Sequence, residues 1–216
     1  MLRLLNELIF PPKCVICKAV LASGHVDLCP NCRKTIEAFS TAKNKFSFIA
    51  GWTSLWYYRQ EPVRESLRRY KFCKYRSYAT NYGRLLAMKL LKENWNTFDL
   101  LTWVPVSALR RFTRTYDQSE LLAEAVGREL NVKPIRTLKK IRNNNAQSLI
   151  RDHAQRRANV IGAYRVPNPV IVRGKRNLLL DDVVTSGSTA SECAKMLMIA
   201  GAKEVWLATI ASAVKQ

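Results

Sequence analysis

Residues 178–190 read LLLDDVVTSGSTA, and the class of fold follows from this stretch. Its apolar start is typical of a strand buried on both faces, and it delivers Asp181 and Asp182 to the end of that strand. A hydroxyl-rich turn around Gly187 then leads directly into a helical pattern. Backbone N–H groups at a helix start, together with neighbouring hydroxyls, bind anions such as phosphate. Carboxylates beside such a cradle indicate a ligand that also carries hydroxyl groups or a divalent cation.

The rest of the chain alternates between strand-like and helix-like segments. We expect strands at 51–58, 99–106, 176–180 and 204–210, helices at 62–72, 77–94, 118–130 and 188–200, and a connector at 35–50. The strands are apolar throughout, which favours a mostly parallel sheet flanked by helices on both faces. We therefore predict an α/β fold, whose ligand lies beyond the carboxyl ends of the strands.

The composition fits a globular chain with a strong positive charge. Among 216 residues, 48% are hydrophobic, which is enough for a packed core and excludes disorder throughout. Lysine and arginine number 36 against 16 acidic residues, so the formal net charge is +20. Such a charge attracts polyanions: nucleic acid, a phosphorylated small molecule or an anionic membrane surface. No apolar run reaches the roughly 18 residues that a membrane span needs.

The first ten residues, MLRLLNELIF, have the leucine spacing of a short amphipathic helix that ends at Pro11 and Pro12. Arg3 and Glu7 interrupt the apolar stretch, and no small-residue cleavage site follows, which disfavours a secretory signal peptide. We therefore expect a cytoplasmic protein.

Four of the six cysteines form two C-x-x-C pairs, at Cys14, Cys17, Cys29 and Cys32. Two such turns complete a tetrahedral thiolate site for structural zinc, whose binding would supply the folding energy of so short a segment. A disulfide interpretation suits secreted chains, and a redox interpretation explains only one pair. His25 could replace one thiolate, although a surface histidine is the simpler interpretation, and Cys73 and Cys193 are expected to be ordinary thiols. We expect residues 1–45 to hold the N-terminal helix and this module, and residues 46–216 to form the α/β domain.

The stretch at 178–190 resembles the signature of type I phosphoribosyltransferases, in which two acidic residues precede T-x-G-x-T. The resemblance implies that Asp181 and Asp182 are the catalytic pair, which holds the ribose hydroxyls of phosphoribosyl pyrophosphate (PRPP). It implies that the following turn binds the 5-phosphate. The residues of this turn and its approach are Val183, Val184, Thr185, Ser186, Gly187, Ser188 and Thr189.

Two further blocks resemble ComF-like proteins, a branch of the phosphoribosyltransferases associated with DNA uptake in competent bacteria. Residues 103–127 read WVPVSALRRFTRTYDQSELLAEAVG, and a third block runs from Gln147 to Tyr164. The four-cysteine module also belongs to this family, so the resemblance covers nearly the whole chain in order. Thr115 and Asp117 depart from the glycine and asparagine usual in the family, which affects the expected geometry of that loop.

The family resemblance also suggests how a leaving pyrophosphate would be held. Magnesium would accompany PRPP, and the loop that includes Val106 and Ser107 would contact the pyrophosphate. Arginine holds phosphate oxygens in two bonds at once, so Arg110, Arg111 and Arg114 are candidate clamps. The sequence shows no nucleobase signature.

Two basic runs are candidates for a nucleic-acid surface. They contain Arg68, Arg69, Lys71, Lys74 and Arg76 in the first run, and Lys139, Lys140, Arg142, Arg156 and Arg157 in the second. Aromatic residues are interleaved in the first run, as in proteins that bind single strands by base stacking. The alternative is a helix whose aromatic residues face the core while its charges face water.

These observations lead us to expect a ComF-like protein that binds PRPP with magnesium and handles single-stranded DNA, with the DNA-uptake machinery as a candidate partner, during natural transformation. Two alternatives stay open. The first is a metabolic phosphoribosyltransferase that acts on a small nitrogenous base. The second is a non-enzymatic DNA-binding protein with a vestigial PRPP pocket.

Overall fold

The computed structural model describes residues 11–21, 27–43, 46–72, 76–95, 97–106, 116–142 and 158–214. The helix expected at residues 1–10 lies outside these ranges, as do His25 and Cys73. Among the described residues, no helix is both long and apolar enough to cross a membrane.

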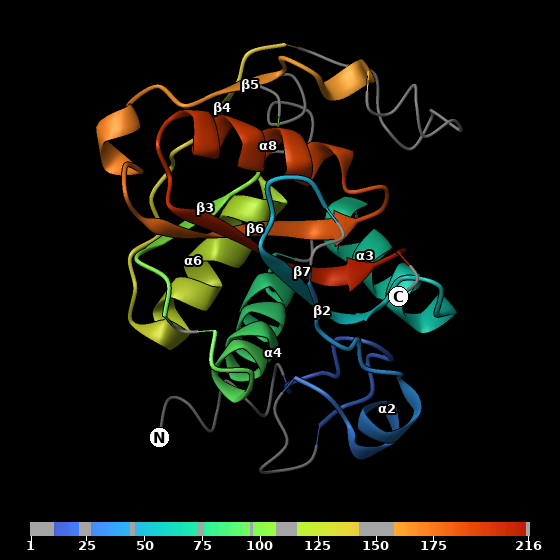
Figure 1. Cartoon of the computed structure of the whole chain (residues 1–216). Coiled ribbons are helices and arrows are strands. Elements are labelled where there is room, and N and C mark those ends of the chain that lie inside the picture. The colour runs from blue at the N-terminus through green and yellow to red at the C-terminus, as the bar shows by residue number, and fades with distance from the viewer. Residues whose placement is uncertain are drawn as a thin grey trace.

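A five-stranded sheet with the order β1-β2-β7-β6-β3 forms the centre of the fold (Figure 1). The strands are β1 (Ala42–Lys43), β2 (Gly51–Tyr57), β3 (Leu100–Trp103), β6 (Arg176–Val184) and β7 (Glu204–Ser212). β1 pairs antiparallel with β2, and all other neighbours pair parallel. The carboxyl ends of four strands therefore lie at one edge of the sheet. The predicted α/β fold with a mostly parallel sheet is confirmed.

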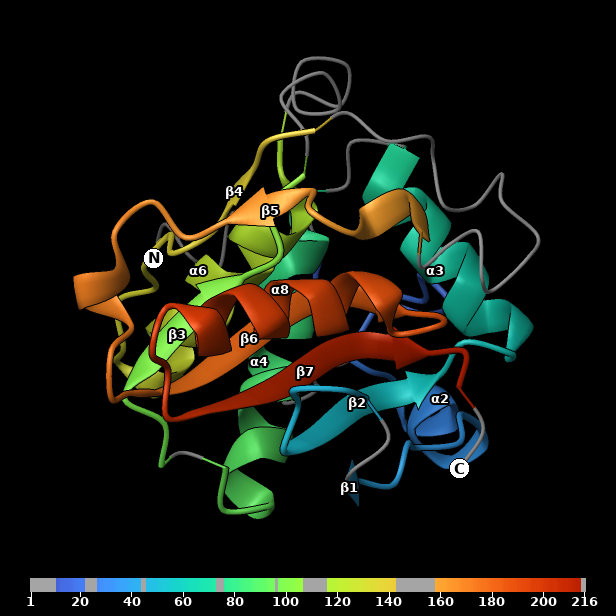
Figure 2. The same cartoon turned by 45° about the horizontal axis from the view of Figure 1, so that its top comes forward.

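Helices cover both faces of this sheet (Figures 1 and 2). The main ones are α3 (Glu61–Phe72), α4 (Tyr78–Lys92), α6 (Gln118–Leu130) and α8 (Ser188–Ile199). α4 and α6 pack together on one face, whereas α8 covers the other. α3 lies beside the carboxyl ends of the strands (Figure 2). The chain therefore builds three layers, with one apolar core on each side of the sheet.

The leucine run of β6 shows why an uninterrupted apolar stretch indicates a central strand. Leu178, Leu179 and Leu180 are all almost completely buried. Leu178 and Leu180 belong to the core beneath α4 and α6, and Leu179 belongs to the core beneath α8. Successive strand residues point to opposite faces, so both faces of a covered sheet demand apolar side chains.

Some short elements were absent from the sequence prediction. β1 lies within the expected connector, and β4 (Lys139–Lys140) pairs antiparallel with β5 (Tyr164–Arg165) in a separate two-stranded sheet. A short 3-10 helix also occurs at Pro169–Ile171. Two-residue strands are too short to show any periodicity, and β4 and β5 are not neighbours in the sequence. No local pattern could therefore reveal them.

The cysteine module packs directly on α3 and α4 and contains a short helix, α2 (Pro30–Thr35). Cys14, Val15 and Ile16 belong to the same buried cluster as the side chains of α4 and α6. The hydroxyl of Ser66 on α3 donates to the carbonyl of Val15, and the Arg69 guanidinium donates to the carbonyl of Ile16 at 2.5 Å. These contacts make the module part of a common core with the α/β layers.

Asp27 anchors the module to α4. Its carboxylate is only 2% exposed and accepts hydrogen bonds from Asn81 Nδ2 at 2.7 Å and Arg84 Nη1 at 3.2 Å. Burial raises the pKa of Asp27, and the charge of Arg84 opposes this shift. A buried carboxylate needs such partners, so Asp27 fixes where the module sits against α4.

We predict that Arg69→Met destabilises the protein by about 1.5–3 kcal/mol, because the buried Val15 and Ile16 carbonyls lose a charged donor. Urea unfolding measures this difference. The matched control is Arg68→Met, one position earlier, where an exposed guanidinium pairs with Glu65. We expect the control to change stability by no more than about 0.5 kcal/mol. Equal effects of the two substitutions would contradict the assigned role of Arg69.

Candidate functional site

An open pocket lies where β6 passes into α8. It is lined by Asp181, Val183, Val184, Thr185, Gly187, Ser188, Thr189 and Ala190. The structure thus brings most of the predicted ribose and phosphate residues into one hollow at the carboxyl edge of the sheet. This is the edge at which ligands of open parallel sheets are usually held.

The turn between β6 and α8 requires glycine for two separate reasons. Gly187 has a φ of +76°, in the left-handed region that other residues rarely adopt. A Cβ atom at this position would lie 2.2 Å from carbon atoms of the Phe46 ring. The hydroxyls of Ser186 and Ser188 lie 2.9 Å apart across the turn. The first N–H groups of a helix have no partners within the helix, so this turn offers donors to an anion.

The two adjacent carboxylates have different surroundings. Asp181 Oδ1 accepts hydrogen bonds from Ser119 Oγ at 2.9 Å and from the backbone N–H of Asp182 at 2.8 Å. Burial, followed by the negative charge of Asp182, raises the pKa of Asp181 to about 7. Asp182 instead forms an ion pair with Lys71 of α3, with 2.9 Å between Oδ1 and Nζ. The pair therefore combines a carboxyl group that titrates near neutral pH with a neutralised carboxylate.

Asp117 fixes the loop that follows β3. Its Oδ1 accepts from the backbone N–H groups of Ser119 and Glu120 at the start of α6, and its Oδ2 accepts from the N–H of Val106 at 3.0 Å. Burial raises the pKa of Asp117. An asparagine would turn an amide donor toward one of these N–H groups. Asp117, which departs from the family pattern, thus caps α6 with one oxygen and holds the segment after β3 with the other.

Val106 is the described member of the predicted pyrophosphate loop. Ser107, Arg110, Arg111, Arg114 and Thr115 lie outside the described residues. The position of Val106 next to the α6 N-terminus places the beginning of this loop beside Ser119, which contacts Asp181. The β3 exit and the acidic pair therefore belong to one site.

The basic residues of the first run do not share one surface. Arg68 is exposed, Arg69 is buried under the cysteine module, and Lys71 reaches into the acidic pair. The Arg76 guanidinium lies over the Tyr116 ring, 5.0 Å from its centre. Lys74 lies outside the described residues. Tyr70 and Tyr78 are buried and face the core, whereas Phe72 between them is 63% exposed.

The second basic run borders the β4–β5 sheet. Lys139 is exposed, the ammonium of Lys140 lies 5.4 Å from the centre of the Tyr164 ring, and Arg142 donates to the carbonyl of Ile161 at 3.2 Å. Arg156 and Arg157 lie outside the described residues. β5 lies against α8, and the backbone N–H of Gly162 donates to Glu192 on that helix. The described part of this run therefore flanks α8, the helix that begins after Gly187.

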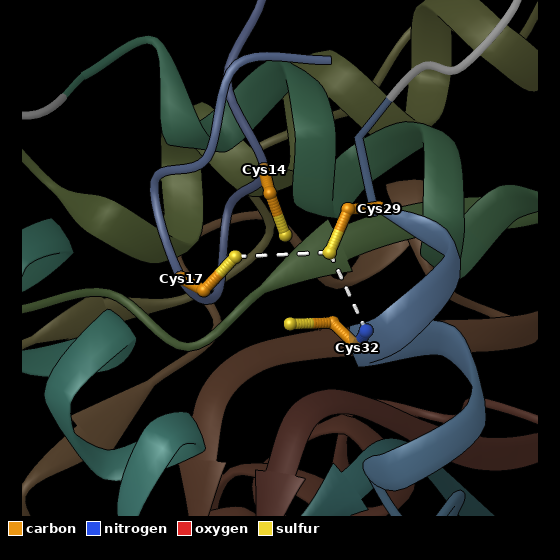
Figure 3. A group of neighbouring side chains, drawn as sticks. All are labelled: Cys14, Cys17, Cys29 and Cys32. Atoms are coloured by element: carbon orange, nitrogen blue, oxygen red, sulfur yellow. Dashed lines mark hydrogen bonds between the residues drawn. The ribbon is translucent and has the colours of Figure 1, made fainter. Parts of the chain in front are cut away.

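The four cysteine side chains of the module point toward one another (Figure 3). The sulfur atoms of Cys14, Cys17, Cys29 and Cys32 all lie within 4.8 Å of one another. Those of Cys17 and Cys29 are 3.7 Å apart, which matches the edge of about 3.8 Å expected for a tetrahedron of sulfurs around zinc. The donor set therefore fits zinc. Four thiolates leave no open coordination position, so the metal would be structural.

Local structure prepares one of these thiols for metal binding. Cys29 caps α2, and its sulfur accepts a hydrogen bond from the backbone N–H of Cys32 at 3.4 Å. This hydrogen bond lowers the pKa of Cys29 to about 7, whereas burial raises the pKa of Cys32. A metal ion would hold all four sulfurs as thiolates.

Comparison with known proteins finds similar sequences over most of the chain. A family model described as a double zinc ribbon domain matches residues 5–43. DNA utilization protein YhgH from Escherichia coli K12 is 26% identical over 220 residues, which covers 91% of this chain and 96% of that protein. Competence protein F from Haemophilus influenzae is 25% identical over 223 residues, covering 89% and 93%. The chain is a homologue of these proteins. The predicted resemblance to the ComF family, with a four-cysteine zinc ribbon, is confirmed.

Solved structures with a similar fold include two proteins that are named for PRPP. One is the glutamine PRPP amidotransferase of Bacillus subtilis, with 23% identity and a TM-score of 0.46 over 66% of this chain. The other is the PRPP synthetase of Mycobacterium smegmatis, with 22% identity and a TM-score of 0.40 over 62%. The chain matches only 30% and 34% of the lengths of these two proteins.

Three parts of the site were not predicted as such from the sequence. Ser119 bonds Asp181, Phe46 packs against Gly187, and Lys71 was assigned to a nucleic-acid surface although it pairs with Asp182. The D-x-S pattern before α6 signals a helix cap, which could have placed Ser119 at an end of α6. Nothing local signals the other two contacts, because each joins segments more than 100 residues apart.

We predict that Asp181→Asn changes how stability depends on pH. Between about pH 4 and 7 the unfolded wild-type chain ionises Asp181 while the folded chain holds its proton, so this residue lowers stability as pH rises through that window. Asparagine does not titrate, and its amide oxygen can still accept from Ser119. Relative to wild type, the variant should gain at least about 1 kcal/mol between pH 4.5 and pH 7.5, the equivalent of one pKa unit. Urea unfolding at both pH values measures the gain, and parallel profiles would contradict it.

Proposed function

We propose that the pocket between β6 and α8 binds the ribose 5-phosphate part of PRPP. The observation that carries this proposal is the succession of an acidic pair on β6, a glycine-dependent hydroxyl turn and the start of α8. Asp181 and the turn line the pocket, and Asp182 is the neighbour of Asp181 on the strand. The turn supplies backbone and hydroxyl donors for a phosphate, and the carboxylates accept from sugar hydroxyls. A sugar phosphate presents both groups at once, whereas a simple anion has no hydroxyl groups to donate to the carboxylates.

Magnesium would accompany PRPP. Its preferred ligands are carboxylate, water and phosphate oxygens, and the acidic pair supplies the carboxylates. When bound, the ion would neutralise charge on the diphosphate group. The chain itself would orient the sugar through Asp181 and Asp182, hold the 5-phosphate in the turn at Thr185–Thr189, and receive the diphosphate near Val106. Such positioning lowers the barrier to displacement at the anomeric carbon because the reacting groups are already oriented.

A transfer reaction further requires a nucleophile that replaces diphosphate. Diphosphate release with a panel of nitrogenous bases separates a metabolic phosphoribosyltransferase from a protein that only binds PRPP. Release with one base would favour the metabolic alternative.

We also propose that the protein handles single-stranded DNA in the cytoplasm during natural transformation. This proposal rests on the names of its relatives, one called a DNA utilization protein and one a competence protein. The net charge of +20 is consistent with a polyanionic partner. Arg76, Lys139 and Arg142 are exposed cations among the described residues and are the candidates for binding DNA phosphates.

We predict that PRPP with magnesium binds the wild-type chain and that the double variant Asp181→Asn, Asp182→Asn abolishes this binding. Replacing both carboxylates with amides removes the two negative charges that would hold the magnesium ion, and it leaves one acceptor oxygen per side chain for the ribose hydroxyls. Isothermal titration calorimetry measures the affinity, and Arg68→Met is the control because its guanidinium is exposed and paired with Glu65. Unchanged affinity in the double variant would show that the ligand binds elsewhere.

We predict that a fluorescent single-stranded oligonucleotide binds with an affinity that falls steeply between about 50 and 200 mM salt. The triple variant Arg76→Ala, Lys139→Ala, Arg142→Ala should reduce the slope of log K against log salt by about 0.7 for each DNA phosphate that the protein no longer neutralises. Fluorescence anisotropy measures both quantities. Absence of binding at low salt would remove the DNA proposal, and an unchanged slope would remove these three residues from the binding surface.

A further inference from the structure

Lys71 lies in the acidic pair although it comes from a helix that precedes the pair by more than 100 residues. Its Nζ atom is 2.9 Å from Asp182 Oδ1, and the two side chains are 23% and 15% exposed. An ion pair so largely removed from water is not one of the weak contacts typical of a protein surface. Lys71 therefore pairs with Asp182, a carboxylate that the proposed function assigns to the ribose hydroxyls of PRPP.

The end of α3 is held firmly, so the position of the Lys71 backbone is defined. Tyr70 donates from its hydroxyl to the carbonyl of Gln118 at 2.7 Å, and Tyr116 donates to the carbonyl of Tyr70 at 2.8 Å. The Gln118 amide also donates to the carbonyl of Lys71 at 3.3 Å. These bonds join the last turn of α3 to the first turn of α6. The backbone of Lys71 is thus fixed, and its long side chain can carry the ammonium group from one partner to another.

The second partner lies at the exit of β3. Gln118, which contacts Lys71, follows Asp117, whose carboxylate holds the N–H of Val106. α6 thereby links the backbone of Lys71 to Val106, near which the diphosphate of PRPP would lie. A lysine side chain has a four-carbon stem and three rotatable donors, so its ammonium group can change partners without backbone movement.

Charge balance gives a reason for this exchange. In the structure the ammonium group of Lys71 offsets the negative charge of Asp182, and it also lowers the pKa of neighbouring Asp181 against the effect of burial. A ligand that brings hydroxyl groups or magnesium to the carboxylates removes the need for this cation. The same ligand brings a diphosphate group that needs one.

We propose that Lys71 is a ligand-binding residue that leaves Asp182 when PRPP enters and binds the diphosphate group at the β3 exit. This inference rests on the proposed function and adds to it a residue from α3. It assigns Lys71 to the pocket and removes it from the nucleic-acid surface. It also implies discrimination between ligands, because a sugar monophosphate must displace the lysine without offering it a second phosphate group.

The test is calorimetry on full-length Lys71→Met with three probes: inorganic diphosphate with magnesium, PRPP with magnesium, and ribose 5-phosphate. We expect the affinity for the first two probes to fall by about tenfold or more, the loss of one charge-assisted hydrogen bond. Ribose 5-phosphate should bind as tightly as to wild type or more tightly, since Asp182 is already released. Lys71→Arg should restore part of the diphosphate affinity, and Arg68→Met on the same helix should match wild type.

The outcomes separate this inference from the proposed function. If wild type binds PRPP and Lys71→Met binds all probes equally well, the inference is overturned and the proposed function stands. Equal losses for all three probes also overturn it, because they indicate general damage to the pocket. If inorganic diphosphate binds through Lys71 while PRPP does not bind, the proposed function fails and the role of Lys71 in anion binding stands. Failure of wild type to bind any probe overturns both.

Discussion

Two carboxylates placed side by side near the end of a buried strand impose a constraint that organises the whole carboxyl edge of the sheet. Asp181 and Asp182 repel each other and lose much of their hydration, so each needs a partner from another element. α6 supplies the hydroxyl of Ser119 and α3 supplies the ammonium of Lys71. Each of these helices therefore directs one polar side chain to the acidic pair on β6. A sequence selected for stability alone would place uncharged residues here.

The helix α3 contacts both the cysteine module and the acidic pair. Along α3, Ser66 and Arg69 hold the backbone of the cysteine module, while Tyr70 and Lys71 reach the end of α6 and the acidic pair. Both sets of contacts lie within two helical turns. The thiolate cluster and the pocket are thus joined by a short, rigid and largely buried segment, even though they lie far apart in the sequence.

The features that could be predicted are those encoded in adjacent residues. The strand, acidic pair, glycine turn and helix at 178–190 form one continuous pattern, and the two C-x-x-C pairs carry their metal preference in their spacing. The contacts of Lys71 with Asp182 and of Phe46 with Gly187 join distant segments and leave no local pattern. Charge alone was ambiguous, since Arg69, Lys71 and Arg76 belong to one basic run yet contact a carbonyl, a carboxylate and an aromatic ring.

The common core of the cysteine module and the α/β layers limits how this protein can be divided. Val15, Leu28 and Cys32 bury apolar surface together with Leu86 and Leu178. A recombinant fragment that began at β2 would expose the apolar side chains of α3 and α4 that the cysteine module covers. We expect such a fragment to aggregate because of this exposed apolar surface. The cysteine module is therefore poorly suited to being removed from this protein or transferred to another one.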